Sequence, residues 1–76
     1  MAKFNGHKNW NHWNVSLWIN NEEPLYRMAR DMVRRNDSRD EAARMMLRAL
    51  GDMGIHATPD GAPYSASAIR AAMVGM

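Results

Sequence analysis

The sequence predicts an all-α fold: a compact single-domain bundle of about four short helices around a tryptophan-rich first helix, preceded by an irregular N-terminal arm. Apolar residues recur at spacings of three and four along most of the chain, as in amphipathic helices. Capping residues such as Ser38 and Ser65 precede these stretches, and no segment alternates as a strand would. The length of 76 residues predicts one small helical domain, which spans residues 1–76.

The composition excludes several classes of protein. The chain is 46% hydrophobic and 24% charged, which lies in the range of folded globular domains. Without cysteine it cannot form disulfides or thiolate metal sites. The net charge of +2 keeps nucleic acid open as a partner without requiring it.

The first helix is the most conspicuous feature. Residues 1–8 lack periodicity, which predicts an irregular arm with a turn at Asn5-Gly6. Asn9 is a plausible N-cap for a helix over about 9–20. Its apolar arc covers about two thirds of the circumference and consists of Trp10, Trp13, Val15, Leu17, Trp18 and Ile19. We therefore expect this helix in the middle of the domain, with the tryptophans supplying buried area.

Two asparagines, Asn11 and Asn14, fall inside that apolar arc. A buried amide without partners costs about 1–3 kcal/mol. Both should therefore bond to something specific, such as the backbone of the Asn5-Gly6-His7 arm or a neighbouring helix end.

The second helix is expected over about 22–35, with Asn20 and Asn21 ending the first helix and capping the second. Its inward stripe is Leu25, Met28, Ala29, Met32 and Val33. Arg27, Arg30 and Arg34 form the opposite face. Asp31 is placed to pair with Arg27 and Arg35.

The third and fourth helices are expected over about 38–53 and 65–75. In the third, Ser38 and Glu41 form a capping box, and the inward residues are Ala42, Met46, Ala49, Leu50 and Met53. Gly54 and Ile55 suit a Schellman ending, and Thr58-Pro59-Asp60-Gly61 suits a type I turn. Ser65 caps the last helix, whose shared side is Ile69, Ala72, Met73 and Met76.

The sequence contains no recognisable arrangement of catalytic residues. We therefore expect no enzyme, no cofactor and no metal site. His7, His12 and His56 are too scattered for a ligand spacing, and no serine or glycine motif suggests a nucleophile or a phosphate loop. No apolar run reaches the roughly 20 residues of a membrane span, and the N-terminus lacks a secretory h-region. A cytoplasmic location is the expectation.

The arginines are the candidate partner-binding residues. Fork-shaped guanidinium groups suit protein interfaces as well as phosphate. If the second and third helices pack side by side, one patch could contain Arg27, Arg30, Arg34, Arg44 and Arg48. The alternative is a solvated face with weak ion pairs to the interleaved aspartates.

Methionine offers a different kind of surface. The chain has eight methionines, whose soft side chains suit irregular cores and adaptable interfaces. Met45, Met73 and Met76 are those expected to reach a partner, and a structural protein that self-associates through them is a third alternative.

The stretch LRALGDMGIHATPDGAPYSASAIRAAM resembles the helix-turn-helix region of large serine recombinases. The resemblance covers residues 42–73 and includes Gly54, Ile55, Thr58, Pro59, Gly61, Tyr64 and Ser65. It implies a nucleic-acid-binding alternative that would use Tyr64, Ser65 and Arg70. The final helix departs from the pattern because Arg70 is its only long donor.

The segments FNGHKNWNHWNVSLWINNEEPLYRMA and GIHATPDGAPYSASAIRAAM resemble a family of very small proteins encoded by bacteriophages and prophages. The resemblance implies a phage accessory protein that acts inside a bacterial cell. Proteins of that context commonly bind and inhibit a host complex, including CRISPR defence machinery. The leading expectation is therefore a non-enzymatic inhibitor of the anti-CRISPR kind, with nucleic-acid binding as the alternative.

Overall fold

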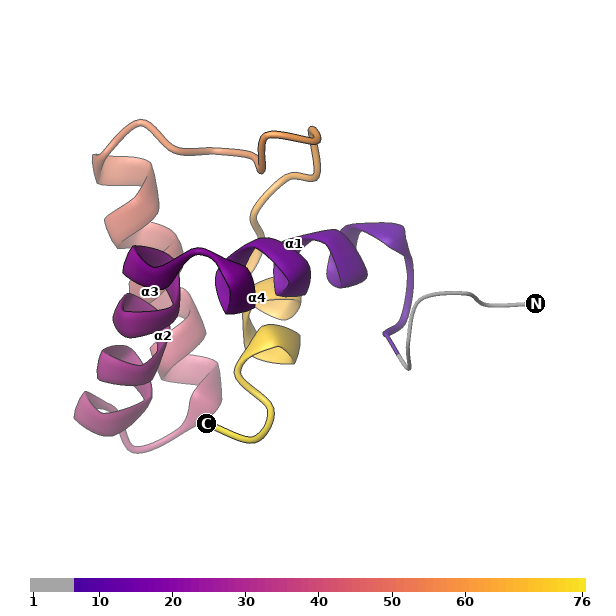
Figure 1. The fold of residues 1–76 in the computed structure, drawn as a ribbon. Helices are drawn as coiled ribbons and strands as arrows, with labels where there is room; N and C mark the ends of the chain where they lie inside the picture. Colours follow the sequence, from indigo (N-terminus) through magenta and orange to yellow (C-terminus); the bar gives the residue numbers. More distant parts are fainter. Residues whose placement is uncertain (1–6) are drawn as a thin grey trace.

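Four helices make up most of the computed structural model, which describes residues 7–76 (Figure 1). They are α1 (Trp10–Asn21), α2 (Glu23–Arg35), α3 (Arg39–Asp52) and α4 (Ala66–Ala72). Within this range no strand forms beyond an isolated bridge between Ala57 and Pro63. The all-α, single-domain prediction is confirmed. The predicted turn at Asn5-Gly6 lies outside the described residues.

Side-chain caps begin three of the helices where the sequence predicts them. The side chains of Asn9, Ser38 and Ser65 accept hydrogen bonds from the third residue of the following helix, which satisfies one orphan donor at each N-terminus. The predicted cap of α2 was wrong. Asn21 belongs to α1 and donates through Nδ2 to the Leu17 carbonyl at 2.7 Å, and the single residue Glu22 joins the two helices in extended conformation.

The helices form a ring in which each contacts two others. The backbone of α1 lies close to those of α2 and α4, and that of α3 lies close to the same two helices, whereas α1 and α3, and α2 and α4, face each other across the core within the described residues. The expectation that α1 lies in the middle of the domain was therefore wrong. The Cα radius of gyration is 11.4 Å, close to the value of about 11 Å expected for a compact chain of this length.

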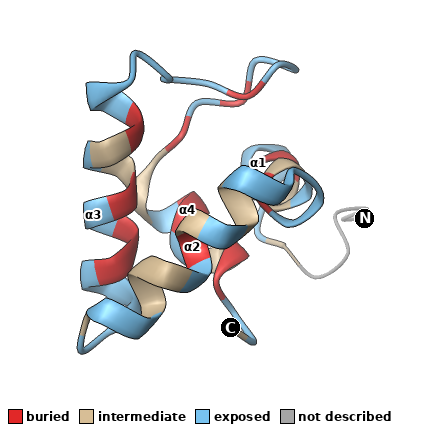
Figure 2. Ribbon diagram, turned by 60° about the vertical axis from the view of Figure 1, so that its left-hand side comes forward, coloured by how far each residue is buried: buried red, intermediate tan, exposed pale blue. Residues whose placement is uncertain are grey.

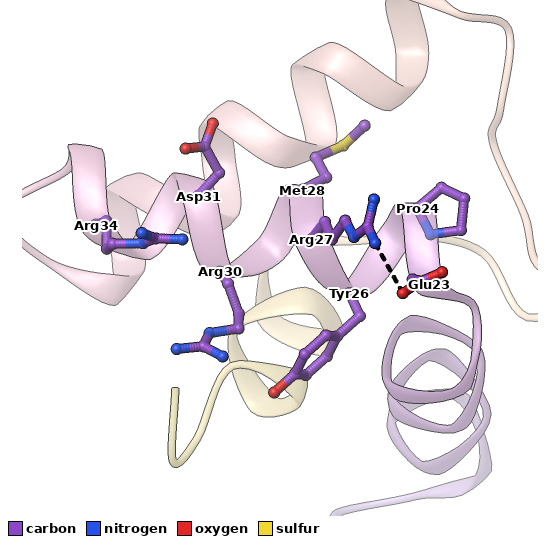
Figure 3. Close-up of a pocket in the computed structure, with 8 residues that line it drawn as sticks. All are labelled: Glu23, Pro24, Tyr26, Arg27, Met28, Arg30, Asp31 and Arg34. Carbon is purple, nitrogen blue, oxygen red and sulfur yellow. Dashed lines mark hydrogen bonds and ion pairs between the residues drawn. The ribbon is translucent and has the colours of Figure 1, made fainter.

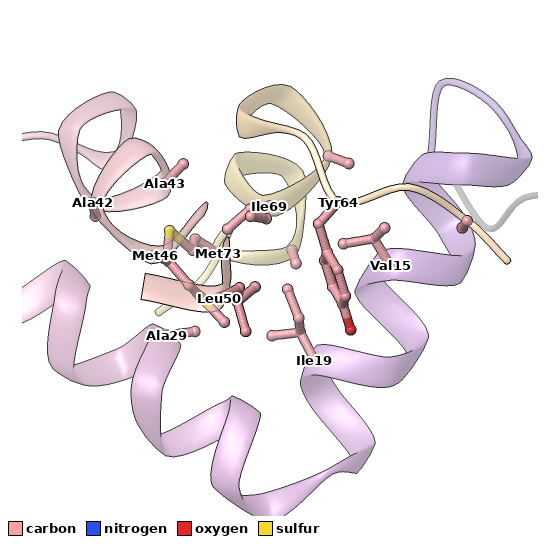
Figure 4. Close-up of a cluster of buried hydrophobic side chains, with 13 residues drawn as sticks. Val15, Ile19, Ala29, Ala42, Ala43, Met46, Leu50, Tyr64, Ile69 and Met73 are labelled. Atoms are coloured by element: carbon pink, nitrogen blue, oxygen red, sulfur yellow. The ribbon is translucent and has the colours of Figure 1, made fainter. Parts of the chain in front are cut away.

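The core lies where the inner sides of the helices meet (Figure 4). Its larger members are aliphatic and methionine side chains together with Tyr64, and alanines allow the helices to approach closely. The buried set is Val15, Ile19, Ala29, Ala42, Ala43, Met46, Leu50, Ala62, Tyr64, Ala68, Ile69, Ala72 and Met73.

None of the three tryptophans is buried, so the prediction that they supply the core was wrong. Trp10 is 39% exposed and Leu17 38%, and Trp13 and Trp18 are partly buried. Only the side of α1 that presents Val15 and Ile19 meets other helices. Among residues 7–76 no further helix covers the opposite side.

Met53 and Met73 each depart from one prediction made from the sequence. Met53, expected inward, is 54% exposed because it follows the last turn of α3, where the chain reverses at Gly54. Met73 is fully buried in the same cluster as Ile69 and Leu50, as its place on the shared side of the last helix predicts, so the expectation that it reaches a partner was wrong. Met45 is exposed as predicted, and Met76 is partly buried. Helix α4 ends at Ala72, before the predicted residue 75, and Gly75 has a positive φ of 90°.

The loop between α3 and α4 is well ordered by local bonds. At its start the amides of Gly54 and Ile55 donate to the Gly51 and Leu50 carbonyls at 3.0 and 2.8 Å. With φ of 77° at Gly54 this is the predicted Schellman ending. At the predicted turn, the Gly61 amide donates to the Thr58 carbonyl at 2.8 Å.

A buried amide fastens this loop to α1. Asn14 is 1% exposed; its Oδ1 accepts from the Thr58 hydroxyl at 2.5 Å and its Nδ2 donates to Asp60 Oδ2 at 2.9 Å. The prediction that Asn14 bonds to a specific partner is confirmed, although the partner is this loop. Asn11 is exposed, so the matching prediction for it was wrong.

Asp60 should make the attachment of the loop sensitive to acid. Bonds from Asn14 and then Trp18, each 2.9 Å, lower the pKa of Asp60 below its ordinary value of 3.8. A depressed folded pKa stabilises the fold above pH 3.8, and the contribution disappears as pH falls through the lower folded value. We expect the NMR signal of the Trp18 indole N–H to shift with a midpoint below pH 3.8. A midpoint at or above that pH, or the same transition in D60N, would contradict the assignment.

Candidate partner-binding surface

The outer face of α2 carries the arginines that the sequence singles out. Ala29 is buried, and Leu25, Met28, Met32 and Val33 pack against the core as predicted. The helical period then places Arg27, Arg30 and Arg34 on the opposite side, where all three are exposed.

A surface depression of about 680 Å³ runs along this face (Figure 3). Its lining residues are Glu23, Pro24, Tyr26, Arg27, Met28, Arg30, Asp31 and Arg34. All of them belong to α2, so the depression is a feature of one helix surface and not an enclosed cavity. It contains no residue of α3.

The two carboxylates of this surface are already paired along the helix. Glu23 accepts from Arg27 at 2.9 Å, and Asp31 from Arg35 at 3.1 Å. The predicted pair between Asp31 and Arg27 is absent, because Glu23 holds Arg27 from the preceding turn. Such exposed pairs contribute only about 0.2–1 kcal/mol each, but they leave no carboxylate of the depression for its other arginines.

Arg30 and Arg34 therefore carry the uncompensated charge of the depression. Neither forms an ion pair with any residue from 7 to 76. The Arg30 guanidinium carbon lies 5.8 Å from the centroid of the Tyr26 ring, within cation–π range. Figure 3 shows Tyr26 and Arg30 projecting from the same side of α2, with Asp31 on another side. Tyr26 was not among the residues predicted from the sequence, although it precedes Arg30 by four residues and so lies on the same side of the helix.

Figure 2 shows that α3 has one buried side and one exposed side. Arg44 and Arg48 both belong to this helix. Both are exposed, and neither forms an ion pair within the described range. They do not line the α2 depression. The structure therefore groups Arg27, Arg30 and Arg34, and leaves the two α3 arginines outside that group.

The residues of the nucleic-acid alternative make internal contacts. Tyr64 is 7% exposed, and burial, followed by the nearby charge of Glu22, raises its pKa. Ser65 uses its hydroxyl to cap α4. Arg70 Nε lies 2.6 Å from Asp40 Oδ1, in an ion pair between α4 and α3. The three side chains do not form one exposed set of donors.

The histidines offer no grouped ligand set. Within residues 7–76 no three His, Cys, Asp or Glu side chains are arranged to hold a metal ion. His12 Nε2 lies 3.1 Å from Ser67 Oγ. Burial lowers the pKa of His12, and the positive charges of Lys8 and His7 add to this effect. None of the helices in the same range is long and apolar enough to cross a bilayer.

Comparison with protein families identifies the family of this chain. A family model described as a family of unknown function, DUF7249, matches residues 1–76. The chain belongs to the DUF7249 family. No curated protein and no solved structure matches it. For this DUF7249 member, the surface chemistry of α2 supplies the basis for a functional proposal.

Proposed function

We propose that this DUF7249 protein acts without catalysis, by binding a partner protein through the depression on α2. The observation that carries the proposal is that Arg30 stacks on the Tyr26 ring and Arg34 lines the same depression of α2. Neither arginine has a carboxylate partner among residues 7–76. Arginine and tyrosine are enriched among the residues that dominate binding energy. The partner should present carboxylates, because these accept two hydrogen bonds from one guanidinium group.

The more specific form of the proposal is a phage accessory protein that inhibits a bacterial host complex in the cytoplasm, most concretely an anti-CRISPR inhibitor. It is supported by the resemblance of residues 5–21 to small phage proteins and by the small size of the chain. A protein of this size inhibits most simply by covering a surface that the complex needs. Nucleic-acid binding would depend on the same Arg30 and Arg34, because Arg70 is paired with Asp40.

Affinity capture from a bacterial lysate, followed by mass spectrometry, tests the proposal. The wild-type chain should retain one host complex at stoichiometric levels. The double variant R30Q/R34Q should reduce its recovery by about tenfold or more, as expected for interface arginines. The matched control R44Q/R48Q removes the same charge from α3 and should retain the complex.

Three outcomes would contradict the proposal. The first is that no protein is enriched, and the second is that both double variants lose the partner equally, which indicates net charge alone. The third is that the captured material is nucleic acid. In that case affinity for a DNA duplex or single-stranded RNA would fall steeply with salt.

A further inference from the structure

A second groove lies where the end of α1, the start of α2 and the α3–α4 loop meet. Its volume is about 360 Å³, and it is lined by Trp18, Glu22, Leu25, Ile55, Ala57, Pro59 and Tyr64. Six of these seven residues are apolar or aromatic. Because they come from two stretches that are distant in the sequence, 18–25 and 55–64, the groove exists only in the folded protein.

The walls of this groove are held in place before any partner arrives. The Trp18 indole N–H donates to Asp60 Oδ2 at 2.9 Å. Tyr64 is almost fully buried, and the Ile55 amide is fixed to the Leu50 carbonyl at 2.8 Å. A binding surface that is already ordered loses little conformational entropy when it is occupied.

The groove contains one carboxylate, and that carboxylate is unpaired. Glu22 forms no ion pair with the described residues, whereas its neighbour Glu23 is paired with Arg27. The Tyr64 side chain lies close enough to Glu22 that the negative charge of this carboxylate adds to burial in raising the pKa of Tyr64. An apolar, aromatic surface therefore carries a single uncompensated negative charge.

We propose that this groove binds an arginine side chain presented by a partner protein. The aliphatic stem would lie against Trp18 and Ile55, and the guanidinium group would meet the Glu22 carboxylate. Arginine combines an apolar stem with a weakly hydrated, planar cation that stacks on aromatic rings. An acidic side chain would be repelled, and a purely apolar one would desolvate Glu22 without compensation. The inference is independent of the α2 depression, whose uncompensated charge has the opposite sign.

An NMR titration of the folded, 15N-labelled chain tests this site. The probe is a capped Gly-Arg-Gly peptide, and its control is the same peptide with citrulline, which keeps the shape of arginine but removes the charge. We expect the arginine peptide to shift the Trp18 indole signal and the backbone amides of Ile55 and Ala57. The citrulline peptide should bind at least about threefold more weakly, the effect of one exposed ion pair.

Two adjacent carboxylates provide a matched pair of variants. E22Q should weaken binding of the arginine peptide by about threefold, and E23Q should leave it unchanged. Both positions are exposed, and thermal melts followed by circular dichroism check that both variants fold. R30Q/R34Q should not change the titration, so failure here and failure of the proposed function are distinguishable.

The inference is overturned if the two peptides bind equally, if E22Q and E23Q behave alike, or if no shift appears up to the solubility limit of the peptide. It is also overturned if the Trp18 indole signal moves with protein concentration in the absence of peptide. That result would assign the groove to an arginine of a second copy of this chain.

Discussion

Replacing Leu50 with alanine should remove most of the stability of this protein. Leu50 is fully buried in the core that all four helices share. Removing a buried leucine side chain costs about 2–5 kcal/mol, because both the transfer energy and the packing contacts are lost. A core of this size supplies only about 3–5 kcal/mol of net stability. The variant should therefore populate the unfolded state substantially at room temperature.

Urea and thermal denaturation followed by circular dichroism measure this loss. Met53→Ala is the control, since it shortens a 54% exposed side chain just after the same helix. It should change the free energy of unfolding by no more than about 0.5 kcal/mol. A loss below about 1 kcal/mol for L50A would show that the core tolerates the cavity, contrary to the expectation.

Asn14→Leu should be the second most damaging change. It deletes the acceptor of the Thr58 hydroxyl and one donor to Asp60, and it places an apolar group where only 1% of the side chain reaches solvent. Thr58 is also buried, at 4% exposure, so water cannot easily replace the lost acceptor. The expected loss is about 1–3 kcal/mol of unfolding free energy.

The exposed Asn11 supplies the matched control, because N11L makes the same substitution on the same helix away from the loop. It should leave the unfolding free energy within about 0.5 kcal/mol of the wild-type value. In N14L the NMR signal of the Trp18 indole N–H should also broaden or shift, since Asp60 loses one of its two hydrogen bonds to α1. Unchanged or increased stability of N14L, with the loop still ordered, would mean that the amide has no structural task.

The α3–α4 connection shows why local features were predictable. Gly54 and Ile55 end α3 through bonds to residues three and five positions earlier, and Ser65 caps α4 through the amide three positions later. The arginine face of α2 follows from the helical period in the same way. Each of these depends on residues within one or two turns, so the pattern of residue types is sufficient to indicate it.

Other features required the tertiary structure. The partner of Asn14 lies 46 residues away at Asp60, and the α3 residue that neutralises Arg70 is Asp40. The same holds for the groove around Trp18, whose walls come from residues 18–25 and the distant residues 55–64. The spacing of residues along one helix does not indicate which distant segment of the chain will contact a given side chain.

The sequence by itself determined the helices, the side-chain caps of α1, α3 and α4, and the sides on which apolar residues and arginines lie, because those depend on short-range geometry. Only the tertiary structure decided which apolar sides are covered. Trp10 and Leu17 lie on an apolar arc but remain more than a third exposed, since packing against α2 and α4 uses the side of α1 that presents Val15 and Ile19. Periodicity reveals an apolar face, and burial requires a neighbour whose position depends on the whole chain.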